Sequence, residues 1–372
     1  MIGRLRPGPA RVEPPCPHFG PGGGCLLQHF AAAPYRLWKR GLLVDALRKR
    51  GFAEAEALVR PLIALPPGTR RRATFTALRQ GRRVLLGFNR RFSHAVEDMT
   101  VCHVLAPPLV ALLPALRQAL APLLPEGKPQ DVTATLTDSG VDLLLALPTE
   151  PDLAGREALA ALAVELDLAR LSLAVAGQAP LPLAERRLPR ILLGGVASTP
   201  PPGGFLQPTP EGGAALTQLV LAAVPSEADT VADLYSGCGT FSFPLAARGH
   251  RVHAVEGDAA ALAALERAAR GGALAQRISA ERRDLERDPV TADELEGGDA
   301  AVFDPPRAGA RAQAAELAAS DLPVVVAVSC NPGTFARDAR ALVEGGYRLE
   351  WVAPRAQFPW TGHLELVARF AR

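Results

Sequence analysis

From about Leu188 onward, short apolar runs alternate with alanine-rich runs, and this alternation constrains the fold more than any other feature of the sequence. Apolar runs of strand length separated by segments of helix length are typical of a parallel β-sheet covered by helices. A final run, 363–370, alternates apolar and polar residues and is therefore predicted to be an edge strand. The pattern indicates an α/β fold with a parallel-dominated sheet over residues 191–372. The other expected elements are strands at 230–235, 251–256, 300–304, 323–329 and 348–353 and helices at 259–269 and 308–319.

The N-terminal half follows a different pattern. A Cys-containing opening precedes a helix predicted over residues 34–51, and a hairpin is predicted from the runs 73–78 and 84–88. Such mixed elements indicate a smaller α+β domain. The Pro- and Gly-rich stretch 198–204 is the expected connection between the halves. We therefore predict three parts: an N-terminal Cys-containing segment (1–33), an α+β domain (34–190) and an α/β domain (191–372).

The composition excludes some classes of protein and leaves others open. Lys occurs only at positions 39, 49 and 128, so nearly all of the positive charge is Arg, and the formal net charge of +3 neither demands nor excludes nucleic acid. The most apolar stretch, 104–124, contains Pro114 and Arg117 and is a poor membrane span. Residues 1–4 lead into Pro and Arg rather than into a signal peptide. Five scattered Cys suit a reducing compartment. We expect a cytoplasmic monomer with no membrane partner.

A glycine-containing turn, 236–239, follows the first strand of the α/β half and opens the next helix. Two glycines there let the backbone approach a ligand at a helix N-terminus. Glu256 ends the next strand, where a carboxylate can accept hydrogen bonds from ribose hydroxyls. The third glycine of a dinucleotide fingerprint would fall at Ser242, which disfavours nicotinamide cofactors. The motif therefore favours S-adenosylmethionine over a dinucleotide-binding dehydrogenase or a turn without a ligand.

Two further strand ends carry groups suited to chemistry. Asp304 with two following prolines ends one strand, and Cys330 before Asn331 and Pro332 ends the next. The carboxyl ends of parallel strands meet at one edge of a sheet, so the thiol and the carboxylate are expected to face one crevice. The alternative for Cys330 is a buried structural thiol. Its position at a strand exit favours reactivity.

Together these segments resemble the bacterial uracil-5 RNA methyltransferase family, which modifies transfer RNA and 23S ribosomal RNA. The resemblance implies a Rossmann-like class I methyltransferase domain that uses S-adenosylmethionine and acts on RNA. The likeness covers almost the full chain, and its segments are 233–246, 255–257, 304–309, 328–338 and 357–365, with weaker upstream segments at 16–20, 24–29 and 87–102.

The resemblance also implies roles for particular residues. Cys330 would attack carbon 6 of uracil, which makes carbon 5 nucleophilic enough to accept a methyl group. Glu365 would remove the carbon-5 proton so that the thiolate can leave; without the family it reads as an ordinary strand carboxylate. Asp284 is a weaker candidate for the adenine end of the cofactor. The cofactor contacts implied are Gln207, Tyr235, Glu256 and Asp304.

Ribosomal-RNA relatives often carry four N-terminal Cys that hold a four-iron cluster. Cys16, Cys25 and Cys102 match three of these positions, but Gly22 stands at the other. Three thiolates can hold a [4Fe–4S] cluster if another ligand takes the fourth iron, and His18 is a conceivable substitute. The equal alternative is a relic loop that has lost its cluster.

Seven arginines are predicted to lie on and beside the hairpin, at 70–72, 82–83 and 90–91. Clustered Arg suits contacts with phosphates and unpaired bases, although a charge run is also typical of a solvated surface. We interpret the cluster as an RNA-binding surface.

The prediction is a uridine-5 methyltransferase acting on RNA, with 23S ribosomal RNA favoured by the Cys-containing opening. One alternative is a transfer-RNA substrate, and another is a catalytically idle RNA-binding homologue. A third is a small-molecule or adenine-N6 methyltransferase, which would leave Cys330 without a role. Ala356 departs from the Asp often found there in relatives.

Overall fold

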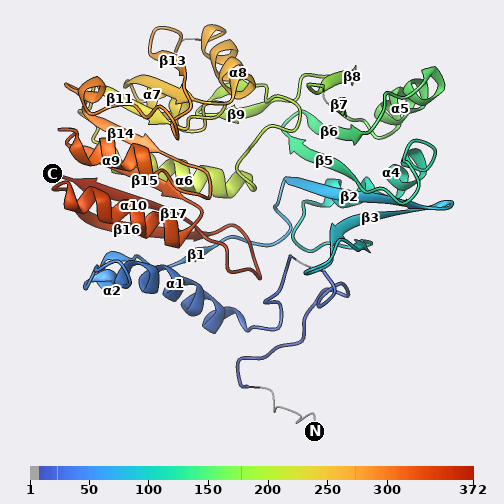
Figure 1. Ribbon diagram of the computed structural model, residues 1–372, viewed down its shortest axis with the longest axis horizontal. Helices are drawn as coiled ribbons and strands as arrows, with labels where there is room; N and C mark the ends of the chain where they lie inside the picture. The colour runs from blue at the N-terminus through green and yellow to red at the C-terminus, as the bar shows by residue number, and fades with distance from the viewer. Residues whose placement is uncertain (1–7, 23, 177, 273) are drawn as a thin grey trace.

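The protein is described here by a computed structural model that covers residues 8–372 except 23, 177 and 273. Two β-sheets lie side by side, one of eight strands and one of seven, with a short two-stranded hairpin between them in the chain (Figure 1). Within the described ranges, no helix combines the length and apolar character that a membrane crossing requires.

The eight-stranded sheet has the order β1-β16-β17-β15-β14-β11-β12-β13. All neighbouring strands are parallel except at β17, which is antiparallel to both β15 and β16. The predicted α/β fold with a parallel-dominated sheet is confirmed. The strands are β1 (Ile63–Ala64), β11 (Thr230–Leu234), β12 (Arg251–Glu256), β13 (Ile278–Arg282), β14 (Ala300–Phe303), β15 (Val324–Ser329), β16 (Arg348–Ala356) and β17 (Glu365–Ala371).

The prediction that the last strand lies at an edge is wrong. β17 is paired on both sides, and nearly all of its residues are buried. The polar residues that suggested an edge have special environments: Glu365 is only 6% exposed, and Arg369 donates a hydrogen bond from Nε to the Ala223 carbonyl oxygen at 2.9 Å. Alternation of apolar and polar residues therefore marked buried polar groups here rather than a solvated face.

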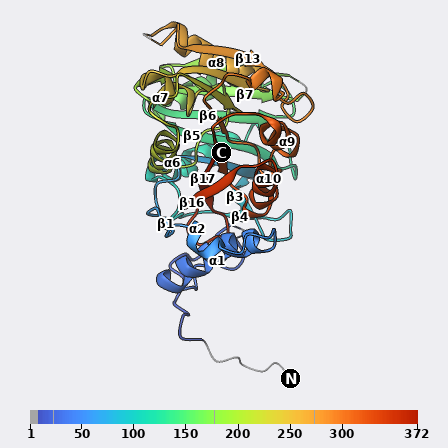
Figure 2. The same cartoon turned by 90° about the vertical axis from the view of Figure 1, so that its left-hand side faces the viewer.

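Helices cover both faces of this sheet, as Figure 2 shows with α6 on one side of β16 and β17 and α9 and α10 on the other. On one face the apolar side chains of α1, α9 and α10 pack in a single core. On the other face α6 and α7 form a second core. The helices after the interdomain connection are α6 (Pro210–Ala223), α7 (Ser242–Ala247), α8 (Ala259–Arg270), α9 (Arg311–Ala319) and α10 (Pro332–Glu344), with a 3-10 turn η1 (Asp293–Leu295).

The first helix belongs with this sheet as well. α1 (Ala32–Arg48) and α2 (Ala55–Leu58) contribute Leu43, Leu47 and Ala55 to the same core as α10, and β1 pairs with β16. The domain boundary predicted at residue 34 did not anticipate this arrangement. The chain begins beside the eight-stranded sheet, passes to the seven-stranded sheet after β1 and later returns, and no sequence pattern near β1 indicates that passage. We retain three parts as a proposal, with this stretch grouped with the α/β domain.

The seven-stranded sheet has the order β4-β3-β2-β5-β6-β7-β8, and its helices form one core with it. The predicted hairpin is confirmed as β2 and β3, which pair in antiparallel register up to Gln80 and Arg83. Gly81 in its turn has φ +63°, a conformation that favours glycine. The elements are α3 (Pro107–Ala111), α4 (Leu113–Leu120), α5 (Leu153–Glu165), β2 (Arg72–Gln80), β3 (Arg83–Asn89), β4 (Val96–Asp98), β5 (Gln130–Thr137), β6 (Gly140–Leu147), β7 (Arg170–Val175) and β8 (Leu181–Glu185), followed by the linking hairpin β9 (Ile191–Leu193) and β10 (Val196–Ser198).

Candidate active site

The sheet order gathers the predicted site residues at one edge. Parallel strands β12, β11, β14 and β15 all end there, and because β17 runs the opposite way it begins there. Across the sheet the edge therefore presents Glu365, Cys330, Asp304, Tyr235 and Glu256 in that order. Ligands of open α/β sheets bind at this edge.

The predicted nucleophile and base lie at the same end of two neighbouring strands. Ser329, the last residue of β15, pairs with Leu366 of β17. Cys330 follows Ser329 directly, and Glu365 directly precedes Leu366. The two side chains are close enough for the Glu365 charge to act on the Cys330 thiol.

Burial dominates the electrostatics of this group. It raises the pKa of Glu365 to about 7, and the nearby Lys39 cation opposes that rise. Burial, with a contribution from the Glu365 charge, raises the pKa of Asp304 to about 8. Burial and then the Glu365 and Asp304 charges raise the pKa of Cys330 to about 11, which Arg307 opposes. The thiol is thus protonated at neutral pH in the protein alone.

Lys39 is a site residue that the sequence reasoning missed. It lies on α1, its side chain is fully buried, and Nζ donates hydrogen bonds to Tyr35 Oη at 3.1 Å and to the Phe358 carbonyl oxygen at 2.9 Å. The sequence analysis did not select Lys39, because it assigned the helix that contains this residue to the α+β domain. The signal that could have indicated a special role was a lysine, rare in this chain, on the apolar side of a predicted helix.

The glycine turn after β11 has the form expected of a ligand loop. Gly237 has φ +58° and Gly239 φ +97°, and a Cβ atom on Gly239 would lie 2.3 Å from the Phe243 ring. Glu256 accepts hydrogen bonds from the backbone N–H of Gly237 at 2.8 Å and of Asp258 at 2.7 Å. These bonds fix the carboxylate beside the turn.

Several polar atoms in this turn are buried and have no hydrogen-bond partner among the described residues: Asp233 Oδ1, Tyr235 Oη and Ser236 Oγ. Such orphaned atoms are rare in native proteins, and an absent ligand is one explanation for them. Tyr235 also has φ +63°, a strained conformation of the kind that is common at binding sites. The residues present therefore fit a bound nucleoside-like cofactor.

A chain of amides joins Asp304 to the interdomain connection. Gln207 Nε2 donates to Asp304 Oδ2 at 3.4 Å, and Gln357 Nε2 donates to Gln207 Oε1 at 3.3 Å. Thr209 Oγ1 in turn donates to Gln357 Oε1 at 3.2 Å. Gln207 thus lies beside Asp304, and Gln357 is an additional member of the chain that the sequence analysis did not select.

The predicted arginine surface divides into two groups. Arg70, Arg71 and Arg72 turn inward: Arg71 Nε donates to the Gln207 carbonyl oxygen at 3.0 Å, and Arg72 Nη2 donates to the Gly203 carbonyl oxygen at 2.9 Å. Burial lowers the pKa of all three guanidinium groups. They connect the two domains, so these three do not form part of the expected surface. The hairpin and loop cations at 82–83 and 90–91 are exposed, as predicted.

The structure gives the predicted iron–sulfur cluster no support. Within residues 8–372, apart from the three omitted positions, no group of three or more His, Cys, Asp or Glu side chains is arranged to hold a metal ion. Burial, followed by the nearby Cys102 and Cys16, raises the pKa of Cys25 to about 11, and burial likewise raises the pKa of Cys102. The three cysteines therefore lie near one another, and burial disfavours the thiolate form of Cys25 and Cys102.

The two positions that could complete a ligand set do not fit one. A Cβ atom at position 22 would lie 2.8 Å from the His18 carbonyl oxygen, so a cysteine there needs the backbone to move. The His18 ring is already engaged, with Nδ1 3.0 Å from Glu97 Oε1 and Nε2 accepting a hydrogen bond from the Thr100 N–H at 3.2 Å. The donor set of this loop does not fit a four-iron cluster.

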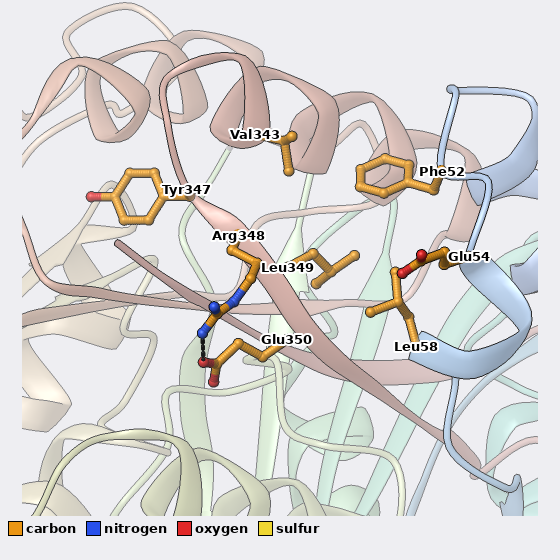
Figure 3. A pocket seen from close by; sticks show the side chains of 8 residues that line it. All are labelled: Phe52, Glu54, Leu58, Val343, Tyr347, Arg348, Leu349 and Glu350. Atoms are coloured by element: carbon orange, nitrogen blue, oxygen red, sulfur yellow. Dashed lines mark hydrogen bonds and ion pairs between the residues drawn. The ribbon is translucent and has the colours of Figure 1, made fainter.

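A separate hollow of about 590 Å³ lies where α2 approaches α10 and β16, and Figure 3 shows the side chains that line it. Phe52, Leu58, Val343 and Leu349 form its apolar part, and Arg348 forms an ion pair with Glu350 at its rim. None of the predicted site residues lines this hollow. It is distinct from the edge that carries Cys330.

Comparison with known proteins agrees with this geometry. Residues 200–370 match the family model described as tRNA (uracil-5-)-methyltransferase. An RNA methyltransferase of Brucella suis is 47% identical over 99% of this chain and 86% of its own length. The 23S rRNA (uracil(1939)-C(5))-methyltransferase RlmD of Aeromonas salmonicida is 33% identical over 98% of this chain and 84% of its own length.

A solved structure shows the same fold. The tRNA (uracil-54, C5)-methyltransferase of Pyrococcus abyssi, in complex with S-adenosyl-L-homocysteine, superposes with a TM-score of 0.75 over 99% of this chain and 88% of its own, at 23% identity. With the two relatives, this likeness confirms the Rossmann-like class I methyltransferase domain. The chain belongs to the uracil-5 RNA methyltransferase family, whose members are S-adenosylmethionine-dependent enzymes.

Proposed function

We propose that this protein methylates carbon 5 of one uridine in RNA through a covalent bond between Cys330 and uracil. The observation that supports the proposal is that Cys330, Glu365 and Asp304 lie at the same edge of the sheet, close enough for both carboxyl charges to act on the thiol. We further propose 23S ribosomal RNA as the substrate, because a relative named for uracil 1939 of that RNA matches nearly the whole chain. Transfer RNA is the second candidate, since the matching family model is named for it.

The geometry supports a two-stage reaction. The Cys330 thiolate adds to carbon 6, and the electrons of the C5–C6 double bond move onto the ring as an enolate. S-adenosylmethionine, when bound, supplies the methyl group that carbon 5 takes up. Glu365 then removes the carbon-5 proton, the double bond re-forms, and the carbon–sulfur bond breaks to return the thiolate. Because the resting thiol has a raised pKa, its proton must leave as the substrate binds.

We assign the cofactor to the edge between β11 and β14. Glu256 is held beside the glycine turn, where it would receive ribose hydroxyls, and the hydroxyl of Tyr235 is buried without a hydrogen-bond partner among the described residues. Gln207 and Asp304 form the other wall of the site. The burial of Asp304 suits a group that contacts a cationic cofactor, because a positive charge nearby stabilises its carboxylate.

We also propose that the protein acts in the cytoplasm as a monomer.

The domain that contains the seven-stranded sheet is the proposed RNA-binding domain. The loop that follows β3 contains Phe92, whose side chain is 94% exposed, and the Arg91 guanidinium lies 4.6 Å from the centroid of the Phe92 ring. An exposed aromatic ring beside a cation suits stacking with an unpaired base. The target uridine must leave its stack to reach Cys330, so we expect it in a loop or flipped out of a helix.

The test uses RNA that carries 5-fluorouridine at the target, because fluorine cannot be removed as a proton. Wild-type protein should form a methylated adduct that survives a denaturing gel, and Cys330→Ala should form neither adduct nor product. Glu365→Gln should methylate ordinary RNA but remain linked to it. Cys102→Ala, which removes a buried thiol in the other domain, is the matched control and should react normally. Methyl transfer by Cys330→Ala would exclude nucleophilic catalysis.

The substrate class has its own measurement. Mapping 5-methyluridine in ribosomal and transfer RNA from a strain that lacks the protein should show one missing site in 23S ribosomal RNA. A missing site in transfer RNA alone would favour the second candidate.

A further inference from the structure

Lys39 occupies an environment in which lysine is rarely found. Its side chain is fully buried among the largest enclosed side chains of the molecule. Burying an ammonium group is costly unless it is paired, and such residues persist only where the surrounding structure or function requires them. In a chain whose cations are nearly all Arg, this lysine therefore calls for a specific explanation.

The hydrogen bonds of Lys39 lead to the loop in front of Glu365. Nζ donates to the Phe358 carbonyl oxygen at 2.9 Å, and its other recorded partner, Tyr35 Oη, donates to the Thr361 carbonyl oxygen at 2.7 Å. Both carbonyl groups belong to the loop between β16 and β17. Glu365 is the first residue after this loop, so α1 holds the segment that sets its position.

Lys39 is also the cation that acts on Glu365. The Lys39 charge lowers the pKa of Glu365, and the Glu365 charge raises that of Lys39, although burial pulls the pKa of Lys39 down to about 7. Burial raises the pKa of both Asp304 and Glu365, and a cation opposes this rise only for Glu365.

Other ionisable groups surround this pair. Asp304 on β14 and Cys330 after β15 face Glu365 from the sheet edge, and their negative forms disfavour its carboxylate. On β16, Arg355 pairs with Glu365 in register, but its Nη1 donates to its own neighbour, the Pro354 carbonyl oxygen. His363 lies near Lys39 as well, and the positive charges there lower its pKa. Lys39 is the cation among these that shifts Glu365.

We propose that Lys39 is a positioning residue: it holds the loop before Glu365 and, in its ammonium form, favours the Glu365 carboxylate that removes the carbon-5 proton. The inference rests on the proposed function and deepens it. In that step the Glu365 carboxylate gains the carbon-5 proton, the C–H electrons form the C5–C6 double bond, and the C6–S electrons return to Cys330. Lys39 forms no bond in this step. Its charge determines how much of Glu365 is ready to act at a given pH.

The choice of lysine is consistent with this role. An arginine would stay charged in any environment and would demand more hydrogen-bond acceptors than the two recorded here. A compact ammonium group fits between Tyr35 and Phe358 and leaves the carboxyl group free for the substrate.

The experiment measures release of methylated RNA from the covalent adduct in single turnover between pH 5.5 and 9. In wild type, release should slow as pH falls through about 7, since Glu365 then becomes protonated. Lys39→Met removes the charge, so the pKa of Glu365 should rise and the slow region should move up by about one pH unit. Formation of the adduct should change little. Lys39→Arg, which keeps the charge, should keep the wild-type pH profile if it folds.

Tyr35→Phe is the matched control, because it removes a hydrogen bond of the same clamp and leaves the charge in place. If Lys39 acts only by clamping the loop, Tyr35→Phe and Lys39→Met will lower release alike, with no movement of the pH profile, and the inference is wrong. Thermal melting and cofactor binding establish that each variant is folded; should Lys39→Met fail to fold, Lys39→Gln makes the same test. Normal release by Glu365→Gln would instead overturn the proposed base, independently of Lys39.

Discussion

Replacing Glu365 with Gln should make the protein more stable while it disables release of product. Burial raises the pKa of this carboxyl group from 4.5 to about 7. A group with a raised pKa contributes stability that is present below its unfolded value and is lost as pH rises to the folded value. Folding of wild type should therefore weaken between about pH 4.5 and pH 7 relative to Glu365→Gln, which has no such titration.

The magnitude follows from the same shift. A difference of about 2.5 pKa units corresponds to about 3 kcal/mol at pH values above 7. Because this shift already includes the opposing effect of the Lys39 charge, the expected gain in the Gln variant is the same amount, about 3 kcal/mol. Below pH 4.5 the two proteins should be almost equally stable, because both carry a neutral side chain at this position.

Urea unfolding of the protein without RNA or cofactor, at several pH values from 5 to 8, measures this difference. Glu294→Gln is an informative control: the pKa of Glu294 is lowered to about 2, first by a hydrogen bond from Arg283. Its loss should destabilise slightly, and by an amount that stays constant from pH 5 to 8, because its titration lies below this range. If the free energy of unfolding of Glu365→Gln fails to rise relative to wild type between pH 5 and 7, burial does not raise the pKa of this carboxyl group.

Three other outcomes are expected. Cys330, whose pKa is raised to about 11, should react with iodoacetamide about 100-fold more slowly than an ordinary exposed thiol at pH 7, and fast labelling by mass spectrometry would contradict its burial. Gly239→Ala should weaken binding of S-adenosylmethionine by about tenfold or more, because the added Cβ would clash with the Phe243 ring and the φ angle disfavours alanine. An unchanged affinity, measured by calorimetry, would show that this turn does not bind the cofactor. Protein purified without air should contain no stoichiometric iron by elemental analysis, since the donors around Cys25 do not fit a cluster, and one cluster per chain would refute this.

The sequence was informative wherever a local pattern decides the structure. Strands at 230–234 and 251–256 and the glycine turn between them follow from apolar runs and positive-φ glycines, which depend only on neighbouring residues. Cys330 could be selected from its position at a strand exit, whereas Glu365 was supplied only by the resemblance. Their proximity could not be found from local patterns, because it depends on where β17 inserts beside β15.

The remaining differences arose from contacts over long sequence distances. In the sequence, Lys39 resembles any other charged residue of a helix; its role depends on the contact between α1 and the loop that contains Phe358, which only the structure shows. Likewise, Arg71 and Arg72 resemble surface cations in the sequence, whereas the structure shows that they donate hydrogen bonds to carbonyl groups of the interdomain connection. In each case the polar group is satisfied by backbone far along the chain, and a single sequence carries no signal of such a partner.

The insertion of β17 has a consequence for how the protein is made. Tyr35 and Thr361, which join the two walls of the proposed base site, are 326 residues apart. During synthesis the glycine turn and Cys330 are made before the strand that contains Glu365. Until β17 inserts between β15 and β16, the sheet has a gap in the middle and the proposed base is absent from the edge that carries Cys330. If Glu365 is the base, we expect release of product to become possible only after the last strand has been synthesised and inserted.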